Sequence, residues 1–151
     1  MATQTETETA AKAPVHLWVV GIVSLLWNAY GAIDYTMTEL GNQAYLTGMG
    51  LDEEALAYVA AFPAWAVAAW AVGVWGSLIG AILLLVRSRF AAPAFLLSLA
   101  GAVVSIGYQF TSDAPASFTS GINAAIPAVI LILIVAQWYY ARRMIAAGVL
   151  R

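Results

Sequence analysis

Four long apolar runs, separated by short polar segments, dominate the sequence. The runs cover residues 15–35, 63–86, 91–110 and 121–141. A helix needs about 20 consecutive apolar residues to cross the hydrocarbon core of a bilayer, and each run is that long. Only helices and closed barrels satisfy their backbone hydrogen bonds inside a membrane. The pattern therefore predicts an all-α membrane protein, a bundle of four transmembrane helices.

The segment before the first run, residues 1–13, has almost no large apolar side chain. Such a segment cannot bury enough surface to offset the entropy of ordering it. We therefore expect a disordered tail followed by one transmembrane domain, residues 14–151. A cleavable signal peptide is the alternative for the first run, but the run is long and no clear small-residue cleavage site follows it. We favour a membrane helix.

One connection, residues 36–62, is long enough to hold structure of its own. It begins with a Gly-rich stretch, residues 41–50, which predicts turns. Asp52 is then placed to cap a short helix that ends near Phe62. This helix either lies in the membrane interface or forms a lid over a substrate site. We favour a short outer interfacial helix, because that position requires no further function.

The composition excludes a water-soluble fold. Apolar residues make up 63% of the chain and charged residues 9%, whereas a soluble domain is about half apolar and a quarter charged. The net charge of −2 and the absence of a clustered basic face also argue against a nucleic-acid partner.

The basic residues predict the orientation, because lysine and arginine favour the cytoplasmic side of short loops. If both termini are cytoplasmic, every basic residue lies on that side, the predicted tail included. We therefore expect a multi-pass protein of the inner (plasma) membrane. The basic residues are Lys12, Arg87, Arg89, Arg142, Arg143 and Arg151.

The residue types for catalysis or metal binding are scarce. The chain has no cysteine, which removes disulfides and thiolate sites together. His16 has no second ligand at helical spacing, so neither a metal nor a cofactor is expected. Paired carboxylates, a nucleophile elbow and a phosphate loop are all missing from the sequence, so we do not expect an enzyme.

Small residues form a stripe along the second run. Lipid tails are as apolar as leucine, so membrane helices associate through close packing of small residues and through polar contacts. Gly73, Gly76 and Gly80 fall on one face of this helix. We expect the second helix to be central, with this face pressed against a neighbour.

Polar residues on the inner stripes of the other helices suggest a binding site. In the predicted orientation they converge in the outer half of the bilayer and outline a small polar pocket open to the outside. Asp34 is the only ionisable group among them apart from tyrosine, which suits a cationic or hydroxyl-bearing ligand. The candidate residues are Asn28, Asp34, Tyr35, Gln109 and Asn123.

Each candidate also has a simpler interpretation, which we favour when the residue is taken singly. Asp34 lies near the end of its run, where water hydrates a carboxylate. Asn28 lies deeper, where an interhelical hydrogen bond that fixes packing is its usual role.

Three segments resemble a family of small bacterial inner-membrane proteins. They are WNAYGAIDY at residues 27–35, FPAWAVAAWAVGVWG at residues 62–76 and RSRFAAPAFLLSL at residues 87–99. Members have about this length and four predicted spans, and they are often labelled sugar transporters. The resemblance covers residues 17–151 and implies the same architecture and location, but it brings no functional residues with it.

Two functions remain open. The first is a transporter-like protein that handles a small polar solute through the outer pocket. Four helices are few for alternating access, which larger carriers build from repeats, so a parallel homodimer or a larger membrane complex is expected. The alternative is an accessory or structural membrane protein that acts through protein or lipid contacts.

Overall fold

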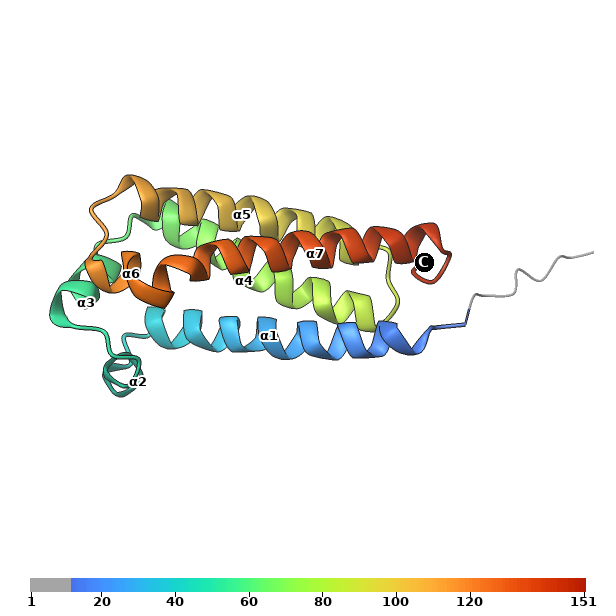
Figure 1. The fold of residues 1–151 in the computed structure, drawn as a ribbon, viewed down its shortest axis with the longest axis horizontal. Helices are drawn as coiled ribbons and strands as arrows, with labels where there is room; N and C mark the ends of the chain where they lie inside the picture. Colours follow the sequence, from blue (N-terminus) through green and yellow to red (C-terminus); the bar gives the residue numbers. More distant parts are fainter. Residues whose placement is uncertain (1–11) are drawn as a thin grey trace, which may run out of the picture.

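Long helices occupy all four predicted runs in the computed structural model, which describes residues 12–151 (Figure 1). Each is long and apolar enough to cross a membrane, and the described residues form no strand. The predicted fold class is therefore confirmed, and the chain is built as a multi-pass membrane protein. Most of the predicted tail, residues 1–11, lies outside the described residues. The four helices are α1 (Val15–Glu39), α4 (Ala64–Leu85), α5 (Ala91–Thr111) and α7 (Ile126–Ala146), the last preceded by the 3-10 turn η1 (Gly121–Ala125).

Proline and left-handed residues set several helix boundaries. Pro14 and Pro63 directly precede α1 and α4, as suits a residue with a fixed φ and no N–H to donate. Helix α1 continues past the predicted end at residue 35, because the next residue with a positive φ is Gly41 at +60°. The extra turn places Asp34 inside the helix instead of at its end.

The connection between α1 and α4 holds two short helices, α2 (Gln43–Gly48) and α3 (Glu53–Ala60). Helix α3 is present as predicted, and Asp52 accepts a hydrogen bond from the backbone N–H of Ala55 at 2.8 Å. The prediction of turns throughout residues 41–50 is wrong. Gly41 and Gly50 both have a positive φ, but the residues between them form α2, which the side chain of Asn42 caps.

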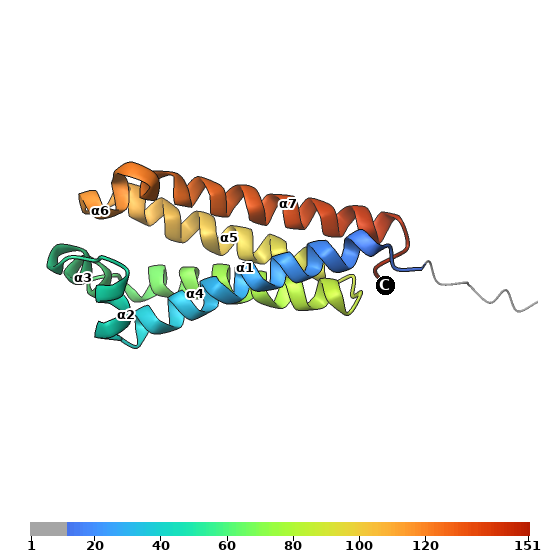
Figure 2. The same ribbon diagram turned by 60° about the horizontal axis from the view of Figure 1, so that its bottom comes forward.

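Helix α4 lies at the centre of the bundle. It packs against α5 on one side and α1 on the other, while α7 packs against α5. Figure 2 shows the same arrangement, with α7 running along α5 and α1 crossing α4. The helices α2, α3 and α6 (Ala116–Thr119) all lie at the end of the bundle away from the C-terminus (Figure 1).

The glycine stripe of α4 faces α5 at contact distance. A Cβ atom added at Gly73 would lie 3.1 Å from the backbone nitrogen of Ala102, and one added at Gly80 would lie 2.8 Å from the ring of Phe95. The Ser98 hydroxyl of α5 also donates a hydrogen bond to the carbonyl oxygen of Gly73. The predicted stripe therefore packs against a neighbour, as small residues in membrane helices do.

Gly101 makes the tightest contact from the α5 side. A Cβ atom there would lie 2.6 Å from the carbonyl oxygen of Ala69 and 2.6 Å from the backbone nitrogen of Gly73. Both obstacles are backbone atoms, which cannot rotate away as a side chain can. The approach of α5 to α4 therefore depends on glycine at this position.

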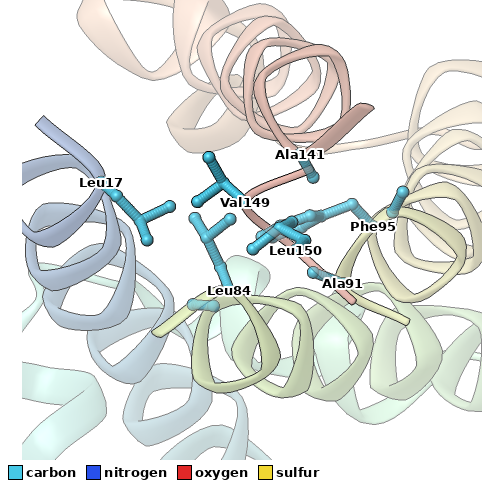
Figure 3. Packing of buried hydrophobic residues seen from close by; sticks show 9 residues of the cluster. Leu17, Leu84, Ala91, Phe95, Ala141, Val149 and Leu150 are labelled. Atoms are coloured by element: carbon cyan, nitrogen blue, oxygen red, sulfur yellow. The ribbon is translucent and has the colours of Figure 1, made fainter. Parts of the chain in front are cut away.

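Packed apolar side chains close the end of the bundle that carries the C-terminus (Figure 3). Leu17, Leu84 and Phe95 are fully buried in this cluster, and they come from three different helices. The residues after α7 complete it: Gly148 turns the chain at φ +67°, and Leu150 packs into the cluster. The backbone of Arg151 then pairs with the α4–α5 turn through hydrogen bonds of 2.8 and 2.9 Å.

Replacing Gly101 with alanine tests the α4–α5 contact. We expect Gly101→Ala to lower the free energy of unfolding by about 1–3 kcal/mol, because the added methyl group overpacks the contact. Gly107→Ala is the matched control on the same helix, since a Cβ atom there meets nothing within 4 Å, and helix propensity makes it neutral or stabilising by up to about 1 kcal/mol. Unfolding in detergent, followed by circular dichroism, measures both. If the two substitutions change the free energy of unfolding equally, the packing of α5 against α4 does not depend on glycine at position 101.

Cysteine labelling tests the predicted orientation, because the chain has no cysteine of its own. Ser88 lies in the α4–α5 turn, and Asp113 lies beyond the other end of α5. We expect an impermeant maleimide to label Asp113→Cys but not Ser88→Cys in intact cells, because positively charged loops stay in the cytoplasm. The reverse pattern would invert the orientation.

Candidate binding cavity

A cavity of about 410 Å³ lies in the half of the bundle away from the packed cluster. Residues of all four long helices line it, together with residues of α2, α3, α6 and η1. Ligand pockets in proteins commonly measure about 300–1,000 Å³. The cavity is therefore large enough for one small molecule.

Asn28 forms the inner end of the cavity at the middle of α1. Its side-chain nitrogen donates to the carbonyl oxygen of Ser77 on α4 at 3.2 Å and to Oε1 of Gln137 on α7 at 3.3 Å. Asn28 is only 5% exposed, and Gln137 is 7% exposed. One amide thus connects three helices, and it also lines the cavity. Asn28 therefore fixes the packing of the helices and also lines the cavity. The sequence offered these two roles as alternatives.

Asp34 lies on the cavity wall about two turns further along α1. Its Oδ1 atom accepts a hydrogen bond of 2.8 Å from the hydroxyl of Tyr45 on α2, and both residues line the cavity. Burial, together with the hydrogen bond to Asp34 and its negative charge, raises the pKa of the Tyr45 hydroxyl well above its usual value. Tyr45 therefore stays protonated and donates to the carboxylate at physiological pH.

Four of the five candidate residues line this cavity: Asn28, Asp34, Gln109 and Asn123. Tyr35 is not among the lining residues. Consecutive helical residues point about 100° apart, so Tyr35 points away from Asp34, and its ring packs edge-on against Trp70 with 5.0 Å between centroids. The expectation that Tyr35 lines the pocket is therefore wrong in this structure.

The lining is mostly apolar and aromatic, which differs from the polar pocket expected from the sequence. Tyr45 and Tyr58 come from the short helices of the α1–α4 connection, and Phe118 comes from α6. The pattern of the sequence did not show that these connections fold back over the spans. The aromatic residues of the lining are Trp27, Tyr30, Tyr45, Tyr58, Phe62, Trp70 and Phe118.

Helix α3 lines the end of the cavity away from Asn28. The hydroxyl of Tyr58 hydrogen-bonds to the hydroxyl of Ser112 at the end of α5. The ring of Phe62 packs edge-on against Tyr108, with centroids 5.1 Å apart. Because Tyr58 and Val59 of this helix line the cavity, and Phe62 just after it does too, this segment contributes to the site. Its position in a membrane interface stays a prediction.

Charge is distributed unequally along the bundle. Asp34 is the only lining residue with a formal charge among those that the structure describes. Glu39, Asp52 and Asp113 lie at the same end of the bundle as the cavity, whereas Arg87, Arg142 and the other described basic residues lie at the opposite end. The cavity therefore lies in a negative field.

Comparison of the chain with known protein families, characterised proteins and solved structures finds no significant match. Within residues 12–151, no three His, Asp or Glu side chains come close enough together to hold a metal ion. The cavity must therefore be interpreted from its own residues.

A double-mutant cycle tests the hydrogen bond between Asn28 and Gln137. We expect Asn28→Leu and Gln137→Leu each to destabilise the bundle, because each leaves a buried amide without its partner. Their coupling energy should be about 0.6–1.7 kcal/mol, the range for polar contacts between membrane helices. Chemical unfolding in detergent measures it. Strictly additive effects would mean that the two amides do not interact.

Proposed function

We propose that this multi-pass membrane protein binds a small solute in the cavity between its four spans. The cavity itself supports the proposal. Membrane bundles are held together by close packing, so a bundle with only a structural role gains stability when side chains fill its interior. Here the half around Leu17, Leu84 and Phe95 is filled, and the other half contains about 410 Å³ of open space.

The lining favours an apolar or amphipathic solute over a sugar. A sugar carries hydroxyl groups on all sides, and each hydroxyl loses free energy if it is buried without a hydrogen-bond partner. Amides and hydroxyl groups, such as those of Asn28, Gln109 and Ser117, line the cavity, but aromatic and aliphatic side chains form most of its walls. An apolar body with one or two polar groups matches this arrangement.

Closure of the cavity at one end supports a transporter-like role. The cavity ends at Asn28, and the packed cluster around Leu84 and Phe95 closes the bundle beyond it. A cavity that is closed at one end is what one state of an alternating-access carrier would require. The opposite state requires the packed end to open. A parallel homodimer in the inner membrane, with cytoplasmic termini, would supply the helices that one copy lacks.

Filling the cavity tests the proposal. Gly31 lines the cavity, and a Cβ atom there meets no atom of a neighbouring segment within 4 Å, so Gly31→Leu adds volume without a backbone clash. We expect this variant to show less quenching of tryptophan fluorescence by 4-bromobenzyl alcohol, because Trp27 and Trp70 border the site and would lose contact with the probe.

Gly107→Leu is the matched control, since this glycine also has open space around it but does not line the cavity. The probe should quench the fluorescence of this control to the same extent as that of the unmodified protein. Probe that partitions into the detergent affects the two proteins equally. If Gly31→Leu also quenches like the unmodified protein, the probe does not enter the cavity. The result would then favour the accessory or structural role.

A further inference from the structure

Among the described residues, the cavity is lined by one carboxylate, which has no cationic side chain beside it, and by several aromatic rings. Together these groups specify a class of ligand. We infer that the site selects hydrophobic organic cations, molecules with an aromatic or alkyl body and one ammonium group, for which Asp34 supplies the countercharge. This inference rests on the proposed function, because it assigns a ligand class to the same cavity.

The carboxylate of Asp34 has binding capacity left for a ligand. A carboxylate offers about four acceptor positions on its two oxygens, and the hydroxyl of Tyr45 uses one of them. No Lys, Arg or His of the described residues lines the cavity. The described lining therefore offers Asp34 no countercharge. A bound cation supplies that countercharge.

The aromatic walls strengthen the preference for a cation. Ammonium groups are attracted to the faces of tryptophan and tyrosine rings, by about 0.5–2 kcal/mol depending on solvation. Trp27 and Tyr30 lie on the same helix as Asp34, and Trp70 lines the cavity from α4. An aromatic wall packs against the apolar body of the ligand and also attracts its charge. A neutral ligand of the same shape packs against the wall but lacks the attraction of the charge.

The electrostatic field at this end of the bundle also favours a cationic ligand. Glu39, Asp52 and Asp113 are exposed near the cavity, and the described basic residues are at the far end. Fixed charges of one sign raise the local concentration of counterions and repel ions of like charge. Anionic solutes of similar size are therefore disfavoured before they reach the cavity.

A pair of isosteric probes separates charge from shape. Phenyltrimethylammonium and tert-butylbenzene differ by nitrogen in place of carbon, and calorimetric titration of the full chain in zwitterionic nanodiscs measures both. We expect the cation to bind at least about tenfold more tightly than the neutral isostere. Asp34→Asn should weaken binding of the cation by about tenfold or more and leave the neutral probe unchanged.

Asp113→Asn is the matched control, because it removes the same charge at the same end of the bundle but outside the cavity lining. It should change the affinity for the cation far less than Asp34→Asn does. An equal effect of the two substitutions would overturn the inference, because the general field of this end, and not the Asp34 carboxylate, would then attract the cation.

A second variant separates ligand binding from a structural role of Asp34 as an anchor for α2. Tyr45→Phe removes the hydrogen bond to Asp34 but keeps the carboxylate, so we expect affinity for the cation to be equal or higher. Loss of cation binding in this variant, or loss of both probes in Asp34→Asn, would mean that the pair only holds α2 in place. Either result would overturn the inference.

The proposed function fails by a different outcome. If the two probes bind equally well, and both less well to Gly31→Leu, the cavity binds solutes without selecting cations. That result overturns the inference and leaves the proposed function intact. If neither probe binds the unmodified protein, or if Gly31→Leu binds both as tightly as the unmodified protein, the proposed function fails and the inference fails with it.

Discussion

The contact between α4 and α5 is the interaction on which the rest of the bundle depends. A membrane provides no hydrophobic force between helices, so association depends on how closely their backbones approach. Gly73, Gly76 and Gly80 on α4, with Gly101 on α5, allow that approach, because a methyl group at any of them would lie within about 3 Å of atoms of the facing helix. The other two long helices pack against this pair, α1 against α4 and α7 against α5.

The outer helices α1 and α7 are joined by polar side chains. His16 and Tyr140 share a hydrogen bond near the packed end, and Asn28 donates to Gln137 at the middle of the bundle. The His16–Tyr140 contact and the apolar cluster lie on one side of Asn28, and the cavity lies on the other. Asn28 therefore marks the boundary between the filled half of the bundle and the hollow half.

The hollow half combines features that a purely structural bundle does not require. Its walls carry aromatic rings, a few amides and one carboxylate, and they border about 410 Å³ of open space. Tyr45 and Tyr58 come from short connecting helices, and each is tied by a hydrogen bond to a long helix. This arrangement supports a binding site between the four spans, with the connections forming the end of the site away from Asn28. Loops and connections commonly carry function in this way.

The sequence by itself determined the four spans, because bilayer thickness requires apolar runs that few other folds contain. It also identified the glycine face of α4 and the inward positions of Asn28, Asp34 and Gln109, because helical periodicity relates residue number to direction around the axis. The tertiary structure alone decided that Tyr35 turns toward Trp70, and that Tyr45 and Phe118 border the cavity. The reason is physical: periodicity describes one helix at a time, and the positions of side chains in connections depend on contacts that form only after the spans have packed.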